Sequence, residues 1–260
     1  MFKKFIFVVF LLLPVLSFAE FRIVSLAPNV TEILFKIGAG DYVVGVSDRC
    51  DFPEEAKAIT EVGSYYRPSL EKILMLNPTH VFGMREGYTK QLKNKLDKFG
   101  IENRFFQAHD YEDIINMIEM IGGIVHKPVD NITGEMREVF GENAAGGNKS
   151  AVFLINAKPA YAAGGGNFVN DIMNCAGLRN PLQGESKSFP QISYEKLYQM
   201  QPDYIILAKR HGSSNGNKFF YEKMEYFNKD VRIIEVEPNI FLRPSYRIMQ
   251  ACRILKQQIR

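Results

Sequence analysis

Two segments of the 260-residue chain carry the same residue types at the same spacing, and several of these residues could contact a ligand or a partner. The segments are residues 68–78 and 192–202, in which a serine, a glutamate, a lysine and a proline coincide without a gap. Each segment is preceded at the same offset by an aromatic residue, Tyr65 in the first and Phe189 in the second. The duplicated unit predicts two similar lobes that act together.

The matched glutamates of this repeat, Glu71 and Glu195, have two interpretations. If Ser69 and Ser193 cap two helices, each glutamate lies in a first turn, where the helix dipole stabilises a carboxylate by roughly 0.3–1 kcal/mol. This local role could account for both residues. The functional alternative is a two-point contact, one glutamate per lobe, with a partner that carries arginines.

Aromatic and arginine residues recur in the loops that follow the predicted strands. In open α/β sheets, ligands bind outside the carboxyl ends of strands, so these loops should face a shared cleft. A large, partly apolar ligand suits such walls, because aromatic rings supply contact area and arginine supplies fixed hydrogen-bond donors. For any single residue, ordinary packing remains the alternative. The set is Arg49, Phe52, Tyr65, Tyr66, Arg67, Met84, Arg85, Tyr161, Phe189, Phe241 and Arg243.

The residue patterns do not nominate a catalytic or metal centre. Gly164-Gly165-Gly166 follows a strand region, but it lacks the Lys-Ser/Thr pair of a phosphate-binding loop, and a flexible turn is the simpler interpretation. The four histidines are scattered, with no pair at helical spacing, which argues against a dedicated zinc site. We therefore predict a binding protein without catalytic residues, metal site or cofactor. A secreted α/β enzyme that uses the cleft is the alternative from another class.

Strand-like and helix-like segments alternate along the chain, which predicts βαβ units and mostly parallel sheets. The expected strands are residues 22–26, 43–46, 80–83, 103–106, 151–155, 203–208 and 232–235. The expected helices are residues 28–37, 70–76, 88–99, 111–121, 167–175, 194–200, 219–227 and 244–258. We predict an α/β protein of two similar lobes, residues 20–125 and 150–260, with the ligand cleft between them. A single bridging helix within residues 126–149 should join the lobes.

The first residues predict the compartment. Lys3-Lys4 lead into an apolar run that ends at Ser17-Phe18-Ala19, which is typical of a secretory signal peptide over residues 1–19. The expected mature protein is exported, soluble and periplasmic, and no cysteine follows the cleavage site to carry a lipid. Loss of the two lysines lowers the formal net charge from +3 to about +1, so nucleic acid is not an expected partner. We expect a monomer.

Three cysteines in an oxidising compartment permit one disulfide and leave one thiol. Cys175 and Cys252 lie on helical patterns, whereas Cys50 lies in a turn-rich loop, so we expect Cys175 to pair with Cys252. Such a bond closes a long loop and is typically worth roughly 2–4 kcal/mol. The alternative is three buried thiols.

With these residues in view, the sequence resembles the periplasmic solute-binding proteins of the cobalamin and ferric-siderophore family that serve ABC importers, and most closely its cobalamin-binding members. The resemblance extends through nearly all of the mature chain. The segments that carry it are residues 23–32, 44–53, 68–78, 189–193 and 241–245.

This resemblance implies two α/β lobes, joined by one long helix, that hold a corrinoid between them for delivery to a membrane permease. Its implied ligand contacts are Tyr65, Met84, Tyr161, Phe189 and Arg243, to which the loop pattern adds Arg49 and Phe241. It also implies that Glu71 and Glu195 dock onto permease arginines and that Cys175 and Cys252 form the family's disulfide.

Two departures from the family pattern bear on the ligand. Arg49 stands where the cobalamin binders commonly have tyrosine, and the chain has no tryptophan, which implies a less bulky pocket. Arginines could instead converge on an anion, since guanidinium groups pair well with carboxylates and catecholates. A ferric siderophore or haem is therefore the alternative ligand. The connector is also short and interrupted by glycines.

Overall fold

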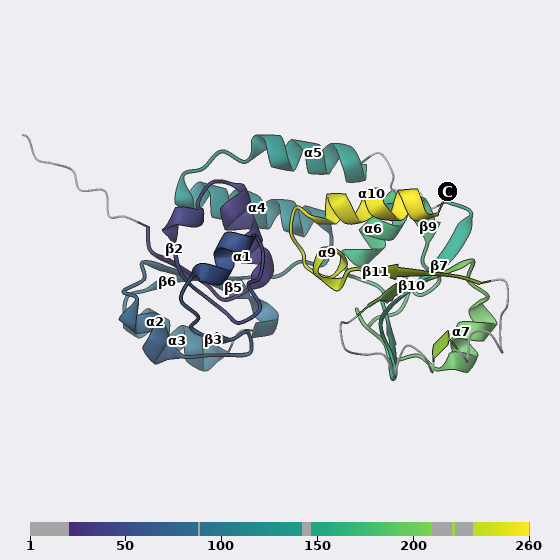
Figure 1. The fold of residues 1–260 in the computed structure, drawn as a ribbon, viewed down its shortest axis with the longest axis horizontal. Coiled ribbons are helices and arrows are strands. Elements are labelled where there is room, and N and C mark those ends of the chain that lie inside the picture. Colours follow the sequence, from purple (N-terminus) through teal and green to yellow (C-terminus); the bar gives the residue numbers. More distant parts are fainter. Residues whose placement is uncertain (1–20, 88, 142–146, 210–219, 222–230, 260) are drawn as a thin grey trace, which may run out of the picture.

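The first lobe is built on a four-stranded, fully parallel sheet of order β2-β1-β5-β6 (Figure 1). The computed structural model describes residues 21–87, 89–141, 147–209, 220–221 and 231–259. The strands of this sheet are β1 (Ile23–Ser25), β2 (Val43–Val46), β5 (His80–Met84) and β6 (Glu102–Phe106). All three residues of β1 are buried, as expected of a parallel strand with helices on both faces.

The helices of the first lobe begin where the sequence supplies a cap. Side-chain oxygens of Ser69, Thr89 and Asp110 each accept a backbone N–H three residues later, which satisfies an otherwise unpaired donor. The helices are α1 (Pro28–Lys36), α2 (Leu70–Met75), α3 (Lys90–Lys98) and α4 (Tyr111–Val125). Shorter elements are η1 (Gly40–Tyr42), η2 (Glu54–Ala58), η3 (Arg85–Gly87) and the antiparallel pair β3 (Gly63–Ser64) and β4 (Arg67–Pro68).

The second lobe has a mixed sheet of order β11-β10-β7-β8, in which β8 alone runs antiparallel and β9 adds a parallel pairing to β7. Its strands are β7 (Lys149–Ala157), β8 (Ala160–Ala162), β9 (Leu178–Arg179), β10 (Tyr204–Ala208) and β11 (Arg232–Val236). Its helices are α6 (Val169–Cys175), α7 (Tyr194–Met200), α9 (Pro238–Phe241) and α10 (Ile248–Gln258).

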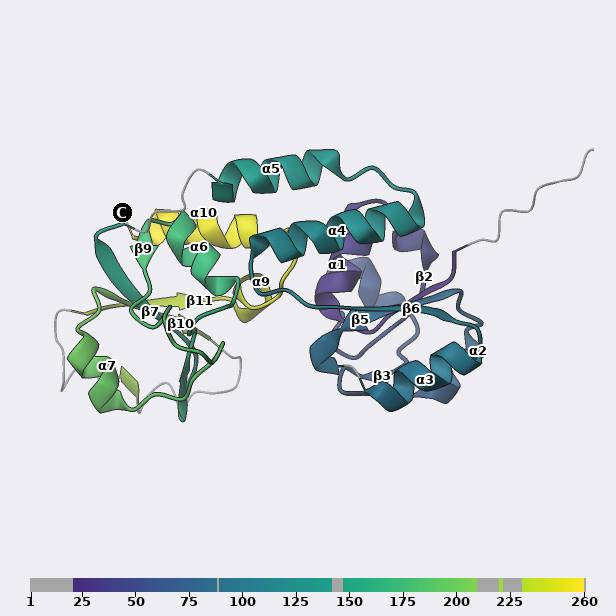
Figure 2. The same cartoon turned by 180° about the vertical axis from the view of Figure 1, so that it is seen from behind.

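Helix α5 (Asp130–Gly141) lies between the two sheets in the sequence and contacts both α4 and α6. In two opposite views, α5 runs along the same side of the molecule as α4 and α10 and extends from one lobe toward the other (Figures 1 and 2). The prediction of an α/β fold with two mostly parallel sheets joined by a bridging helix is confirmed.

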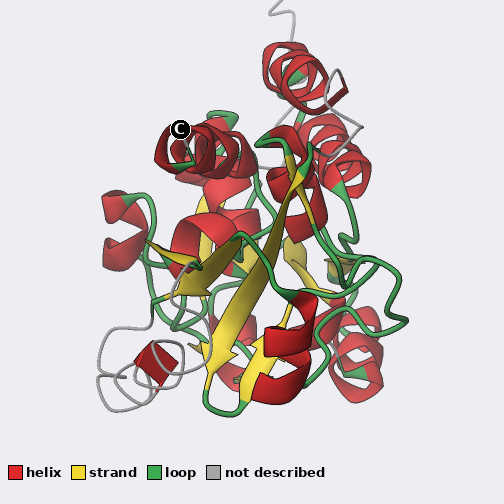
Figure 3. Ribbon diagram, turned by 90° about the vertical axis from the view of Figure 1, so that its right-hand side faces the viewer, coloured by secondary structure: helices red, strands yellow, loops and turns green. Residues whose placement is uncertain are grey.

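The apolar core is continuous between the lobes on the side of α4, α5 and α10, and divided on the opposite side. Helices cover the strands from both sides (Figure 3). Phe82 of the first sheet and Phe153 of the second belong to one cluster of buried residues. Their neighbours Val81 and Val152, which point to the other face of each sheet, belong to two separate clusters.

Two helix boundaries lie four residues from the expected positions: the end of α4, expected at Ile121, and the start of α10, expected at Pro244. Helix α4 continues past Ile121 to Val125 and ends at His126, which is left-handed and donates its backbone N–H to the carbonyl oxygen of Gly122. Residue 122 is a glycine inside the helix because a Cβ there would lie 2.5 Å from Val129. Helix α10 begins at Ile248 because the residues after Pro244 are held in other contacts, described below.

Some expected elements lie outside the described residues. These are the leader at residues 1–19 and most of the helix expected at residues 219–227. Among the helices that the structure describes, none combines the length and apolar character needed to cross a membrane.

Candidate functional site

A cavity of about 960 Å³ lies between the two lobes, and its walls come from the loops that follow the parallel strands. Met84 is the last residue of β5, Lys209 follows β10, and Glu237 follows β11. This is the position at which open α/β sheets place their ligands. The volume is at the upper end of the roughly 300–1,000 Å³ typical of small-molecule pockets.

Five of the seven residues predicted to contact a ligand line this cavity. Arg49, Tyr65 and Met84 come from the first lobe, and Phe189 and Arg243 from the second part of the chain. The structure therefore brings together residues up to 194 positions apart, and the matched aromatics Tyr65 and Phe189 are both on the wall.

The other two, Tyr161 and Phe241, do not line the cavity. Tyr161 belongs to β8 and bridges to Gln191, whereas the sequence pattern placed it in a loop. Phe241 is 1% exposed and stacks on Phe153 at 6.1 Å between ring centroids. Its buried position gives Phe241 a packing role beneath the cavity wall.

The aromatic part of the wall in the first lobe is formed by Tyr65 and Tyr66, whose rings meet edge to face at 4.7 Å. The backbone N–H of Tyr65 donates to Asp48 Oδ1 at 3.0 Å, which fixes the loop. Burial and the nearby carboxylate of Glu86 raise the pKa of Tyr65, so its phenol stays protonated and can donate a hydrogen bond. Tyr66 is 69% exposed.

Met84 supplies the deeper apolar surface of the same wall. It is 5% exposed, and its sulfur accepts a hydrogen bond from Asn29 Nδ2 at 3.2 Å. The same amide donates to the carbonyl oxygen of Pro244 at 3.2 Å. Asn29 thus joins the first lobe to the segment before α10.

Glu32 is the centre of an ion-pair network that the sequence did not predict. Its carboxylate is fully buried on α1 and accepts from Arg243 Nη1 and Arg247 Nη1, both at 3.0 Å. Ser245 Oγ also donates to Glu32, at 2.5 Å. These contacts hold residues 243–247 against the first lobe and explain why α10 starts only at Ile248.

Asp51 completes the network at the cavity. It accepts from Arg243 Nη1 at 2.6 Å and from Asn239 Nδ2 at 3.3 Å. Burial alone would raise the pKa of Asp51, but the hydrogen bond and charge of Arg243 outweigh it and lower the pKa. Burial would likewise lower the pKa of Arg243, and its pairing with Asp51 and Glu32 raises it instead. Both groups stay ionised near neutral pH.

The ion-pair network determines how much positive charge the cavity arginines offer to a ligand. Two carboxylates, Glu32 and Asp51, balance Arg243 and Arg247, so Arg243 brings hydrogen-bond donors but little net charge. Arg49 is exposed and has no ion-pair partner within the described part of the chain. Lys209 pairs with Glu235 at 2.6 Å. The positive charge available to a ligand therefore comes chiefly from Arg49.

The signal for Glu32 in the sequence is a carboxylate inside an apolar helix. Val30, Ile33 and Leu34 around it are buried, so its charge requires a buried counter-charge. The partners could not be read from the sequence, because Arg243 and Arg247 lie 211 and 215 residues away.

His109 is a second wall residue that the sequence did not single out. It lies in the loop before α4, its backbone N–H donates to Asp113 Oδ2 at 2.8 Å, and its imidazole contacts Gln107. Within the described residues, no group of three or more histidine, cysteine or carboxylate side chains could hold a metal ion by itself.

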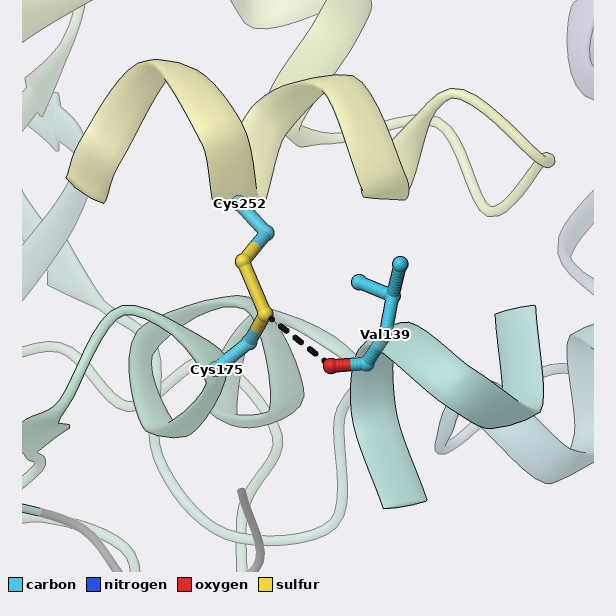
Figure 4. The surroundings of a disulfide bond; sticks show 3 residues. All are labelled: Val139, Cys175 and Cys252. Atoms are coloured by element: carbon cyan, nitrogen blue, oxygen red, sulfur yellow. Dashed lines mark hydrogen bonds between the residues drawn. A yellow bond between two sulfur atoms is a disulfide. The ribbon is translucent and has the colours of Figure 1, made fainter. Parts of the chain in front are cut away.

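The predicted disulfide is confirmed: Cys175 of α6 is bonded to Cys252 of α10 (Figure 4). Cys175 Sγ also lies 3.5 Å from the carbonyl oxygen of Val139 on α5, a packing contact because the oxidised sulfur has no proton to donate. Cys50 is buried as a free thiol, and burial raises its pKa. With Cys175 and Cys252 bonded to each other, the chain has no further cysteine that could pair with Cys50.

Glu71 and Glu195 lie away from the cavity, each in the first turn of its helix. Ser69 Oγ and Ser193 Oγ accept the amides of Lys72 and Lys196, so both serines are helix caps as predicted. Both glutamates are exposed. The helix-dipole role is therefore available to both.

One sequence pattern typical of hydrolases lies outside the described residues. Residues 212–216 read Gly-Ser-Ser-Asn-Gly, which has the Gly-x-Ser-x-Gly spacing of a nucleophile turn. The spacing alone is weak support for an enzyme, because that chemistry also requires partners for the serine.

Comparison with known proteins gives consistent results. The chain is 32% identical over 200 residues to a vitamin B12-binding protein of Vibrio campbellii, covering 75% of this chain and 72% of the relative. It is 26% identical over 257 residues to a vitamin B12-binding protein of Salmonella typhimurium, covering 95% and 94%.

Solved structures show the same fold. A periplasmic heme-binding protein of Vibrio cholerae matches with a TM-score of 0.81 at 20% identity, covering 93% of this chain and 99% of that one. A periplasmic vitamin B12-binding protein of the same species matches with a TM-score of 0.73 at 22% identity, covering 91% and 95%. The family model described as periplasmic binding protein matches residues 23–226, and the chain therefore belongs to this family of non-enzymatic solute-binding proteins.

Proposed function

We propose that this protein captures cobalamin or a related corrinoid in the cavity between its lobes and delivers it to an ABC importer. The observation that carries the proposal is the cavity of about 960 Å³ with aromatic and thioether walls, in a chain whose curated relatives include vitamin B12-binding proteins. Tyr65, Met84 and Phe189 offer the broad apolar surface that a flat macrocycle needs.

The polar part of the cavity also suits a corrinoid. A corrin carries several neutral amide side chains, which need hydrogen-bond partners more than opposite charge. Arg243 is held by Glu32 and Asp51, so it can donate to an amide oxygen without adding an unbalanced charge. The neutral phenol of Tyr65 is a further donor.

Calorimetric titration of the purified mature protein with cyanocobalamin tests this function. We expect one-to-one binding, and Tyr65→Ala or Phe189→Ala should weaken it by about tenfold, as for the loss of a central aromatic contact. Phe99→Ala is the control, because Phe99 is exposed and outside the cavity wall. Absence of heat at micromolar cyanocobalamin would overturn the proposal.

Haem is the second candidate ligand, and the metal-ligating side chains of the cavity favour it. Tyr65, Met84 and His109 are three residue types that ligate haem iron, and all three line the wall. The exposed charge of Arg49 could pair with a propionate. Binding of hemin with a shifted Soret band, lost in Tyr65→Phe or His109→Ala, together with no binding of cyanocobalamin, would assign haem.

We also propose where and with whom the protein works. The apolar run after Lys3-Lys4 supports export and cleavage of residues 1–19, and membership of the periplasmic binding protein family supports a periplasmic mature protein. Glu71 and Glu195, exposed on equivalent helices of the two lobes, support docking onto arginines of a permease.

A further inference from the structure

The two repeat helices expose an apolar side chain beside each glutamate. Met75 of α2 is 74% exposed, and Tyr198 of α7 is 44% exposed. Glu71 and Met75 are four residues apart, and Glu195 and Tyr198 are three apart, so each pair lies on one face of its helix.

Helices α2 and α7 pack against their lobes in the same way. Ile73 and Leu197 are the buried anchors, exposed by 0% and 1%. Each helix is followed by a left-handed residue, Asn77 with a φ of 46° and Gln201 with a φ of 43°. Shared caps, anchors and ends mean that the two exposed faces are presented by equivalent scaffolds.

The matched lysines do not belong to this exposed face. Lys72 Nζ donates to the carbonyl oxygen of Glu61 at 3.4 Å, and Lys196 Nζ pairs with Glu185 at 2.6 Å. Each lysine is therefore engaged within its own lobe. The charged residue that shares a helix face with the exposed apolar residue is Glu71 on α2 and Glu195 on α7.

The two helices lie on one side of the molecule. In both opposite views, α2 and α7 are on the side away from α5 and α10, one at each lobe (Figures 1 and 2). Isolated exposed hydrophobic residues are common, and Phe99 and Met120 are examples. Met75 and Tyr198 differ from these examples, because each lies within about one helical turn of a matched glutamate, although Met75 aligns with Gln199 and Tyr198 with Leu74 in the repeat.

We propose that Met75 and Tyr198 are the apolar contacts of a two-point docking surface for a two-fold symmetric membrane permease. Each permease subunit would present a cationic side chain beside an apolar recess, matching a glutamate and its apolar neighbour. Complementary charges speed the encounter of the two proteins and fix their orientation, whereas buried apolar contacts slow their dissociation. Methionine and tyrosine suit this role, because both bury much surface at low cost. The inference rests on the proposed delivery to an importer.

The test measures docking and ligand binding separately. The probe is the corrinoid importer cloned from the same bacterium, held in lipid nanodiscs and titrated with ligand-free binding protein by surface plasmon resonance. We expect Met75→Ser and Tyr198→Ser each to weaken docking by about tenfold, as at an interface centre. Met120→Ser is the matched control, because Met120 is a half-exposed methionine on α4. All variants should bind cyanocobalamin as the wild type does.

Salt separates the apolar contribution from the charged one. The loss caused by Glu71→Ala with Glu195→Ala should shrink as salt screens the wild-type ion pairs, whereas the loss from Met75→Ser with Tyr198→Ser should persist. Docking of the serine variants at wild-type strength would overturn this inference and leave the glutamate docking intact. If the alanine variants also dock normally, the whole docking surface is wrong, while cyanocobalamin binding still decides the ligand.

Discussion

At the residue scale, Glu32 does the most to define the site. Its carboxylate is fully buried, and its counter-charges come from Arg243 and Arg247 near the other end of the chain. With Asp51 the group is electrically balanced, which makes burial of these charges tolerable. The network positions Arg243 at the cavity and joins residues 243–247 to α1.

Glu32→Gln should therefore destabilise the protein strongly. The amide keeps the shape of the side chain but leaves Arg247 buried without its counter-charge, so the free energy of unfolding should fall by about 3–5 kcal/mol. Chemical denaturation followed by circular dichroism measures this change. Glu54→Gln is the control, because its pair with Lys57 is exposed and should be worth less than about 1 kcal/mol. Equal effects of the two substitutions would contradict the account.

The site could be predicted from the sequence where the signal was local. The repeat identified Tyr65 and Phe189 because matched positions in duplicated units occupy matched places on the cavity wall. Glu32 was missed because its partners are fixed by tertiary structure. Tyr161 was placed in a loop because the short antiparallel strand β8 carries little periodic signal.

At the element scale, three helices meet at the disulfide. The bond joins α6 to α10, and the carbonyl of Val139 on α5 packs against Cys175. The bridging helix α5 therefore packs against two helices, α6 and α10, that are covalently linked to each other. Closing a loop across 77 positions restricts the unfolded chain.

Replacing Cys175 and Cys252 together by serine should lower the free energy of unfolding by about 2–5 kcal/mol, chiefly through greater freedom of the unfolded chain. Urea denaturation of the variant and the oxidised wild type measures the difference. A thiol assay on denatured, unreduced wild type should find Cys50 alone. Three reactive thiols would show that the bond is absent.

The element pattern was predictable wherever caps and glycines mark boundaries. Ser69 and Ser193 marked the starts of α2 and α7 correctly. Gly122 does not mark the end of α4, because the segment that leads to α5 packs on it and leaves no room for a side chain. That tertiary contact with Val129 cannot be read from the sequence.

At the scale of the whole molecule, the lobes share one apolar core on the side of α5. Phe82 and Phe153 belong to the same buried cluster, although they lie in different sheets. A large movement of one lobe relative to the other would expose part of this core to water. The free-energy cost is about 25 cal/mol for each Å² of apolar surface exposed. We therefore infer that the lobes move little when a ligand enters.

A carboxylate at the contact between α4 and α6 makes the stability of the folded protein depend on pH. Asp171 of α6 accepts the backbone N–H of Tyr111 at 2.8 Å. Burial raises the pKa of Asp171 to about 6 and outweighs that hydrogen bond, with a further increase from Asp110 and Glu112. The folded protein thus holds this proton more tightly than the unfolded chain does.

The sign of the effect follows from that difference. As pH rises from about 4 to above 6, Asp171 ionises readily only in the unfolded chain, so stability falls by at most about 3 kcal/mol. Asp171→Asn should remove this loss and make the variant the more stable protein at pH 7.5, with the gap closing toward pH 4. Urea denaturation across this range measures both profiles, and parallel profiles would contradict the assignment.

The state of the cysteines has a practical consequence. Cys50 is 5% exposed, and the other two cysteines are bonded to each other, so the oxidised surface offers no thiol for modification. A cysteine introduced on α2 or α7 would be the single accessible target for a maleimide dye. The protein is therefore ready to become a fluorescent reporter whose emission follows the arrival of a membrane partner.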